Sequence, residues 1–135
     1  MSAHNQTGVA LATMLAGAAM FIGALPLIYH KVPRNRFFGI RLGDALTSER
    51  RWYDINAYGG RAAARWSWPI VITGLIGLLL PSQFASIYVP TATVIALLIA
   101  LIPAIQTIRW IHMTRTDLTN RSSQPLTGAI TRFPR

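Results

Sequence analysis

The sequence contains no cysteine and only four acidic residues among 135. Without cysteine, disulfides, thiolate metal ligands and cysteine nucleophiles are all excluded. Charged residues make up 13% of the chain, whereas an ordinary globular domain has about 25%. The chain also has no P-loop, nucleophile elbow, dinucleotide-binding fingerprint or zincin motif. We therefore predict that the protein is not an enzyme and that it uses no cofactor or metal.

Apolar residues are abundant instead, at 52% of the chain with a mean hydropathy of +0.37, which is typical of membrane proteins. The first long apolar run, residues 8–29, carries no charge. As a helix its 22 residues extend about 33 Å, enough to cross a hydrocarbon core of about 30 Å. Further spans are expected at residues 62–80 and 88–111. We expect one membrane domain, residues 1–113, in contact with the lipid bilayer.

The second of these spans is short, because its uncharged part from Trp66 to Leu80 extends only about 22 Å as a helix. We expect it to begin near Ala62, with the Arg65 side chain reaching back to the membrane surface. In the third span, Pro90 suits the first helical turn and Pro103 predicts a kink.

The first apolar run could alternatively be a secretory signal peptide. A signal peptide needs a basic segment before the apolar run, followed by a cleavage site. Here Lys31, Arg34 and Arg36 follow the run, and residues 1–7 contain no lysine or arginine. The order favours a retained transmembrane helix.

The basic residues predict the orientation of the chain. All thirteen Lys and Arg residues lie in 30–65 or 109–135, and none lies in 1–7 or 81–87. Because positive residues stay on the cytoplasmic side of a membrane, we expect a multi-pass protein of the bacterial plasma membrane with its N-terminus outside. The loop 30–61 and a flexible polar tail at 114–135 would be cytoplasmic. This placement accounts for the net charge of +9 without nucleic acid as a partner.

Residues 35–60 combine charged, aromatic and glycine residues, unlike the rest of the chain. Thr47 can cap a helix that begins near Ser48, and Glu49 suits its positive first turn. From there one face is apolar and the other is rich in arginine, which predicts an amphipathic helix on the membrane surface, continuing into the next span or separate from it. The apolar face consists of Trp52, Ile55, Gly59, Ala62 and Trp66. The predicted fold is therefore all-α, with three transmembrane helices and one interfacial helix.

Arg41 is the most suggestive single residue, because Gly39 and Gly43 place it on a turn near the headgroups. Its guanidinium could hold a carboxylate, phosphate or carbonyl of a ligand, or bind the loop backbone or Asp44. The other polar candidates have simpler roles. Asp44, Glu49 and Asp54 suit ion pairing and capping more than acid–base or cation chemistry. Histidine and tryptophan near the expected membrane surfaces suit polar anchors and an aromatic belt better than haem or metal ligation. They are His30, His112, Trp52, Trp66, Trp68 and Trp110.

The 35–60 stretch resembles the loop of the SdpI-type membrane proteins, a family named for an immunity protein against a secreted peptide toxin. The residues that match the family pattern in order are Asn35, Gly39, Arg41, Leu46, Ser48, Glu49, Trp52, Asn56 and Gly60. Leu42 and Gly43 stand where the family has Thr-Pro, so a contact made by that threonine hydroxyl would be missing. The resemblance extends over about residues 8–113 and implies a short form with three helices.

The resemblance implies a protein that binds a peptide toxin, a lipid or a protein partner through its arginine-centred cytoplasmic loop. The expected binding residues are Asn35, Gly39, Arg41, Ser48, Glu49, Trp52, Asn56 and Gly60. The alternative is a small accessory subunit of a larger membrane complex, or a homo-oligomer, formed through helix one. Small residues recur along that helix with the spacing that lets helices approach closely in lipid: Gly8, Ala12, Ala16, Ala19 and Gly23.

Overall fold

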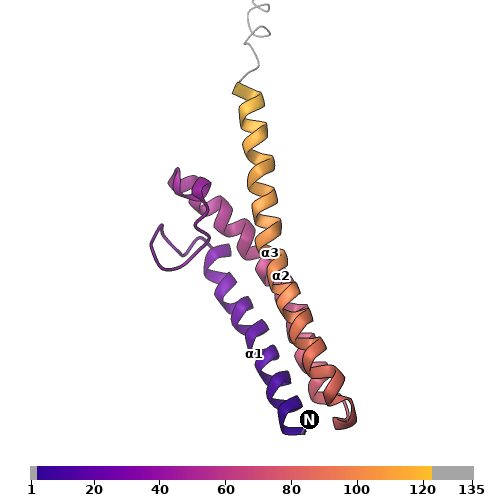
Figure 1. Ribbon diagram of the computed structural model, residues 1–135. Coiled ribbons are helices and arrows are strands. Elements are labelled where there is room, and N and C mark those ends of the chain that lie inside the picture. The colour runs from indigo at the N-terminus through magenta and orange to yellow at the C-terminus, as the bar shows by residue number, and fades with distance from the viewer. Residues whose placement is uncertain (1–2, 123–135) are drawn as a thin grey trace, which may run out of the picture.

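The computed structural model describes residues 3–122, and over this range the protein is helical with no strand (Figure 1). Three helices are long and apolar enough to cross a membrane. They are α1 (Ala3–Ile28), α2 (Glu49–Leu79) and α3 (Ala85–Ser122), and two short 3₁₀ helices, η1 (Gly43–Leu46) and η2 (Ser82–Phe84), lie in the connections. The all-α prediction is confirmed for these residues.

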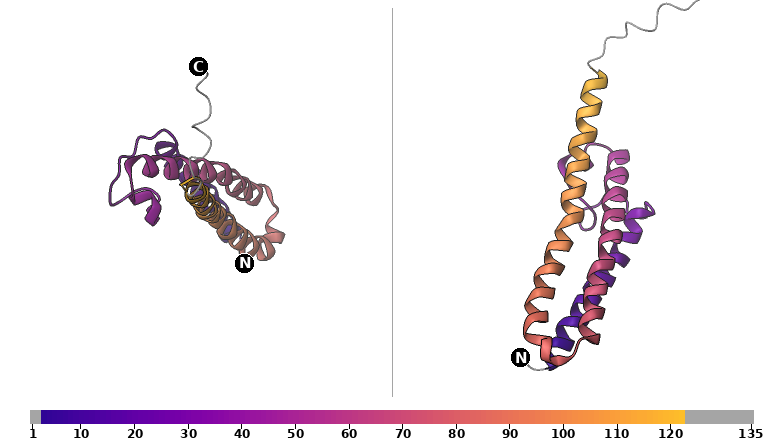
Figure 2. Two further views of the ribbon diagram at one scale, coloured as in Figure 1. Left: turned by 90° about the horizontal axis from the view of Figure 1, so that it is seen from above. Right: turned by 90° about the vertical axis from the view of Figure 1, so that its right-hand side faces the viewer.

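The three long helices run up, down and up along a common direction, as the two views in Figure 2 show. The N-terminus and the tight α2–α3 connection lie at one end (Figure 1). The longer connection between α1 and α2, residues 29–48 and here called the 29–48 loop, lies at the other end, beyond which α3 projects. Packing between α1 and α2 is the most extensive, and that between α1 and α3 is the least.

Glycines on both helices allow α1 and α2 to pack closely. A Cβ on Gly17 would lie 2.7 Å from the Val71 Cγ2 atom, and a Cβ on Gly74 would lie 2.6 Å from the Ala10 carbonyl oxygen. Because lipid tails are as apolar as the helices, close backbone packing rather than the hydrophobic effect holds membrane helices together. The small residues that do this are not those expected from sequence: Gly8 and Gly23 face open space.

Helix α2 is continuous from Glu49 to Leu79, so the interfacial helix predicted within residues 48–61 is not a separate element. Its apolar face does not lie on a membrane surface in isolation, because Trp52 and Ile55 are fully buried together with Ala45 and Ile111. Because α2 is continuous from Glu49, the second span is no longer too short to cross a membrane. That span takes its extra residues from before Ala62, as expected, but the helix extends much further.

The start of α2 is capped by Ser48 rather than by Thr47. The Ser48 backbone is extended, with φ −153° and ψ 160°, and its side chain accepts a hydrogen bond from the Arg51 N–H at 3.2 Å. Thr47 instead donates its hydroxyl to the Asp44 carbonyl at 2.7 Å and so closes the 3₁₀ helix η1. Glu49 lies in the first turn as predicted.

Helix α3 begins earlier and ends later than the sequence indicated. It starts at Ala85, directly after η2, so both Pro90 and Pro103 lie inside it. It continues to Ser122, which means that the polar segment expected as a tail at 114–135 is helical over residues 114–122. The rest of that predicted tail lies outside the described residues.

Candidate functional site

The 29–48 loop is held on the first turns of α2 by two buried side chains, Trp52 and Asn56. The Trp52 side chain is 0% exposed, and its indole N–H donates to the Val32 carbonyl at 3.0 Å. Asn56 is 2% exposed; its Oδ1 accepts from the Ile40 N–H at 2.6 Å and its Nδ2 donates to the Trp52 carbonyl at 2.9 Å. Because residues i and i+4 share one face of a helix, this pair clamps both arms of the loop.

Gly39 is needed where the loop passes over this pair. Its φ is +111°, a conformation that residues with a Cβ rarely adopt. A Cβ there would also lie 2.7 Å from Asn56 Oδ1 and 3.0 Å from Trp52 Cζ2. The glycine thus sets the direction in which the chain continues to Ile40 and Arg41.

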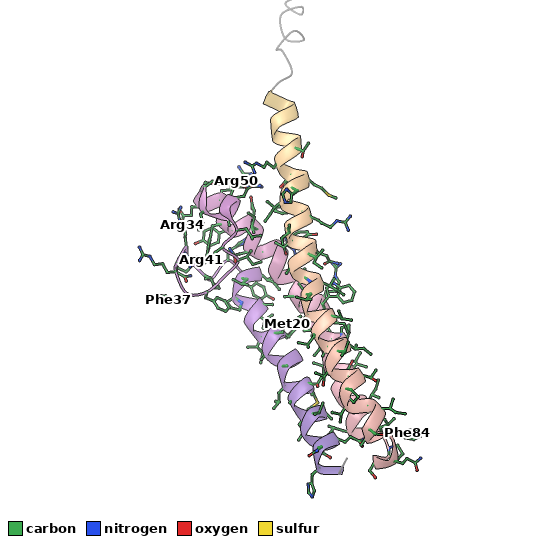
Figure 3. The ribbon with its side chains drawn as sticks, viewed as in Figure 1. Met20, Arg34, Phe37, Arg41, Arg50 and Phe84 are labelled. Atoms are coloured by element: carbon green, nitrogen blue, oxygen red, sulfur yellow. The ribbon has the colours of Figure 1, made fainter. Side chains whose placement is uncertain are left out.

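Asn35 builds the outer turn of the loop. Its Oδ1 accepts hydrogen bonds from the Phe37 and Phe38 N–H groups, each at 2.8 Å, and its Nδ2 donates to the Pro33 carbonyl at 2.8 Å. An asparagine that folds the backbone in this way forms an Asx-type turn. The turn leaves the Phe37 side chain 97% exposed at the tip of the loop (Figure 3).

Arg41 uses one nitrogen within the loop and leaves the remainder of its guanidinium available. Its Nη1 donates to the Arg36 carbonyl at 2.9 Å, so of the alternatives weighed from sequence, the bond to the loop backbone forms and the pair with Asp44 does not. Within the described residues no acidic side chain pairs with Arg41. A guanidinium has five N–H donors, and most of them can still meet a ligand.

Asp44 joins the loop to the two neighbouring helices. Its carboxylate lies 3.6 Å from Arg51 Nη2 on α2 and 3.9 Å from Arg115 Nη1 on α3. The Arg51 guanidinium also donates to the Thr114 hydroxyl at 3.3 Å. Ion pairing was the simpler role predicted for the carboxylates, and Asp44 confirms it. The Asp44–Arg51 pair is half-buried, whereas Arg115 is exposed, and exposed pairs contribute only about 0–1 kcal/mol each. We therefore regard these contacts as positioning the loop.

Beneath the loop, the three helices enclose a mainly apolar cavity of about 350 Å³, here called the Arg41 cavity. Arg41 is the one charged residue in its lining, and the Thr107 hydroxyl in its wall is already bonded to the Pro103 carbonyl at 2.7 Å. The lining comes from α1, the loop, α2 and α3: Met20, Leu27, Ile40, Arg41, Leu42, Gly59, Ala63, Ala100, Pro103, Ala104, Thr107 and Ile108. A second cavity of about 390 Å³ shares Met20 and Ala100 with it and continues along α1 and α3.

The structure separates the expected binding residues by role. Gly39, Trp52 and Asn56 lie together as the clamp. Gly60 packs on α1, where a Cβ would lie 3.1 Å from Ile28 Cγ1. Asn35 shapes the loop and Ser48 caps α2, which leaves the exposed Arg41 and Glu49 as the two whose charged groups face outward.

The histidines and the other tryptophans have separate neighbours. His30 meets the Tyr53 ring edge-on at 5.5 Å, whereas His112 lines a hollow beside Asp44 and Arg115. Among the described residues there is no group of three or more His, Cys, Asp or Glu that could hold a metal ion. The aromatic-belt prediction is wrong for Trp52, which is buried beneath the loop, but the Trp68 side chain is exposed.

Sequence reasoning missed the walls of the Arg41 cavity. Met20 and Leu27 on α1 and Ala100, Pro103 and Ala104 on α3 are ordinary residues of apolar runs, and their spacing does not say which face points inward. In the sequence, only Gly59 could have indicated this cavity. A Cβ at Gly59 would lie 3.0 Å from Thr107 Oγ1, so a glycine there allows α2 and α3 to approach closely.

Comparison with known proteins gives one match. A family model described as the SdpI/YfhL protein family matches residues 31–109, which include the loop, α2 and most of α3. No curated protein and no solved structure matches the chain. The matched range contains the whole clamp and Arg41, whereas α1 lies before it.

Proposed function

The chain belongs to the SdpI/YfhL protein family, and from this we propose that it acts as a toxin-immunity protein, which binds a peptide toxin through Arg41 and the cavity beneath it. Family membership and three membrane-spanning helices make it a multi-pass membrane protein. Binding at the loop is our inference. Binding a toxin requires no chemical reaction, so we do not propose an enzymatic activity.

The observation that carries the proposal is an exposed arginine, Arg41, in the lining of a mainly apolar cavity. At about 350 Å³ the Arg41 cavity falls within the range of about 300–1,000 Å³ typical of ligand sites. Apolar side chains of a membrane-active peptide would enter it, while a carboxylate or a carbonyl of the peptide would bind the Arg41 fork. The clamp supports this role because a loop fixed before binding loses little conformational freedom on binding.

The position of the loop supports a cytoplasmic site. Within the described residues, the lysines and arginines lie in the 29–48 loop, in residues 50–65 of α2 and in residues 109–121 of α3, and the N-terminus and η2 lie at the end opposite the loop (Figure 1). By the positive-inside rule the loop then faces the cytoplasm and the N-terminus faces outward. A toxin bound there would be intercepted at the inner surface of the plasma membrane.

The test is survival of cells that lack the gene and carry plasmid copies of it, challenged with the toxin of the same or a neighbouring strain. We expect the wild-type copy to protect the cells and Arg41→Ala to remove most of the protection. Arg34→Ala is the matched control, because Arg34 is exposed on the same loop but does not line the cavity. Equal survival with Arg41→Ala and wild-type protein, at equal protein levels in the membrane, would overturn the role of Arg41.

One observation favours a second function, that of an accessory subunit in a larger membrane complex or a homo-oligomer. Part of the predicted small-residue face of α1 is open among the described residues, since a Cβ on Gly8 or Gly23 would meet nothing within 4 Å and Ala12 and Ala16 are exposed beside the second cavity. Extraction in a mild detergent followed by size determination distinguishes the two functions. A stoichiometric partner lost with Ala12→Leu would support the subunit, and a lone monomer would count against it.

A further inference from the structure

A second polar hollow lies on the seam between α2 and α3, apart from the Arg41 cavity. It has a volume of about 230 Å³ and shares no lining residue with that cavity. We call it the Arg65–Arg109 hollow. Its lining consists of Tyr58, Arg65, Gln106, Arg109, Trp110 and Met113. Two arginines from different helices therefore face one small space.

No acidic group whose side chain the structure describes balances these two charges. Among the described residues, Asp44 pairs with Arg51 and Arg115, and Asp54 pairs with Arg50. Neither Arg65 nor Arg109 is in a described ion pair or hydrogen bond, and the lining of the hollow contains no carboxylate. Two like charges in a shared hollow repel each other, and the repulsion is stronger near lipid than in water. An anion between them would remove this repulsion.

The hollow lies near the level at which α1 ends. Gly60 of α2 packs against Leu27 and Ile28 at the end of α1. Arg65 follows Gly60 by about 7.5 Å of helical rise toward the centre of the membrane. On α3, Arg109 lies only about 3 Å from the level of Thr107, which faces Gly59. Along the helix axes, Arg65 and Arg109 therefore lie on either side of the level at which α1 ends, and a helix of this length that spans the bilayer ends near the headgroups.

The walls of the hollow are fixed before any ligand binds. The Tyr58 and Trp110 rings stack with centroids 4.8 Å apart and planes 14° apart, and the Arg51 guanidinium lies 5.8 Å from the Trp110 centroid. The Trp66 indole N–H donates to Gln106 Oε1 at 3.3 Å, which leaves the Gln106 amide N–H groups as donors. The hollow thus offers two guanidinium forks and an amide, all of them donors.

We propose that the Arg65–Arg109 hollow binds the phosphate of an anionic phospholipid from the leaflet on the loop side. Guanidinium forks bind phosphate oxygens in bidentate fashion, and basic pockets between transmembrane helices are a recurring site for anionic headgroups. The volume suits a headgroup, while the acyl chains remain in the surrounding bilayer. This site is independent of the proposed function, since it shares no lining residue with the Arg41 cavity.

The test is lipid binding by the full chain in a zwitterionic detergent. Phosphatidylglycerol and phosphatidylcholine with identical acyl chains are titrated, and bound lipid is counted by native mass spectrometry. We expect the wild-type protein to bind phosphatidylglycerol preferentially. With about 1 kcal/mol for each arginine near a membrane surface, each single variant, Arg65→Gln or Arg109→Gln, should weaken binding about five-fold, and the double variant roughly 25-fold.

The matched control is Arg34→Gln with Arg36→Gln, which removes the same charge from the exposed loop. It should bind phosphatidylglycerol as the wild-type protein does. An equal loss in this control would show that net charge alone attracts the lipid, and would overturn the site. Unchanged affinity in both single variants would also overturn it, even if the double variant fails to fold. If inorganic phosphate competes as well as the lipid at equal concentration, the ligand is a free anion and the lipid assignment is wrong.

Discussion

At the scale of single residues, one buried asparagine connects the loop to its helix. Asn56 supplies both an acceptor and a donor at the point where the loop crosses α2, so both the N–H and the carbonyl of the partly buried Ile40 are hydrogen-bonded. A buried N–H without a partner costs about 1–3 kcal/mol. The match of this residue to the family pattern therefore has a structural explanation that does not involve a ligand.

The glycine beside it gives the sharpest prediction at this scale. Gly39→Ala should destabilise the protein by about 2 kcal/mol or more, because the new Cβ would both strain a φ of +111° and press on Asn56. Gly43→Ala is the matched control, since nothing lies within 4 Å of a Cβ there. Thermal unfolding in detergent measures both. Equal midpoints for the two variants would contradict this account of Gly39.

At this scale, the sequence predicted the role of a residue correctly where that residue type has one main structural role. Gly39 was expected to permit a turn, and Asp44 and Asp54 were expected to form ion pairs, and both expectations hold. Trp52 was assigned to an aromatic belt because a tryptophan near a membrane surface and one beneath a loop have the same sequence neighbours. Only the fold of the 29–48 loop distinguishes the two.

At the scale of elements, the close packing of α1 against α2 is the main feature of the fold. One glycine-to-alanine substitution on each helix tests this packing, and we expect the two to change the stability of the protein in opposite directions. Gly74→Ala should destabilise the protein by about 1–3 kcal/mol, since its Cβ would lie 2.6 Å from the Ala10 carbonyl oxygen and the Met14 nitrogen. Gly23→Ala should be neutral or stabilising by up to about 1 kcal/mol, because that position is open and alanine favours helix.

Unfolding with a denaturing detergent measures both changes. If Gly74→Ala proves as stable as the wild-type protein, the backbone contact with α1 is not as close as described. If Gly23→Ala destabilises the protein strongly, the open face of α1 is covered by a partner, as in the accessory-subunit function.

The helices themselves were predictable, but their faces and ends were not. Three apolar runs of sufficient length follow from composition. The extra interfacial helix was predicted because an apolar face opposite arginines looks the same whether lipid or a folded loop covers it. In α2 the loop covers it, and the helix continues without a break. The small residues of α1 are so numerous that spacing alone does not show that Gly17, rather than Gly8 or Gly23, packs against α2.

At the scale of the whole molecule, orientation is the property that the proposed function depends on most. Because the chain contains no cysteine, single cysteines can be introduced without background labelling. In intact cells, a maleimide that cannot cross the membrane should label Gln83→Cys, in η2, and should not label Thr47→Cys, in the loop. Permeabilised cells should show labelling of both. Labelling of Thr47→Cys in intact cells would reverse the orientation and remove the basis for a cytoplasmic binding site.

Because α3 continues to Ser122, it also sets how far the chain extends beyond the other two helices. At the loop end, α3 continues past both α1 and α2 as an unbroken rod (Figure 1). From Trp110 to Ser122 the rise is about 18 Å. The last turns of α3 thus extend beyond the loop by a length that the helix itself fixes.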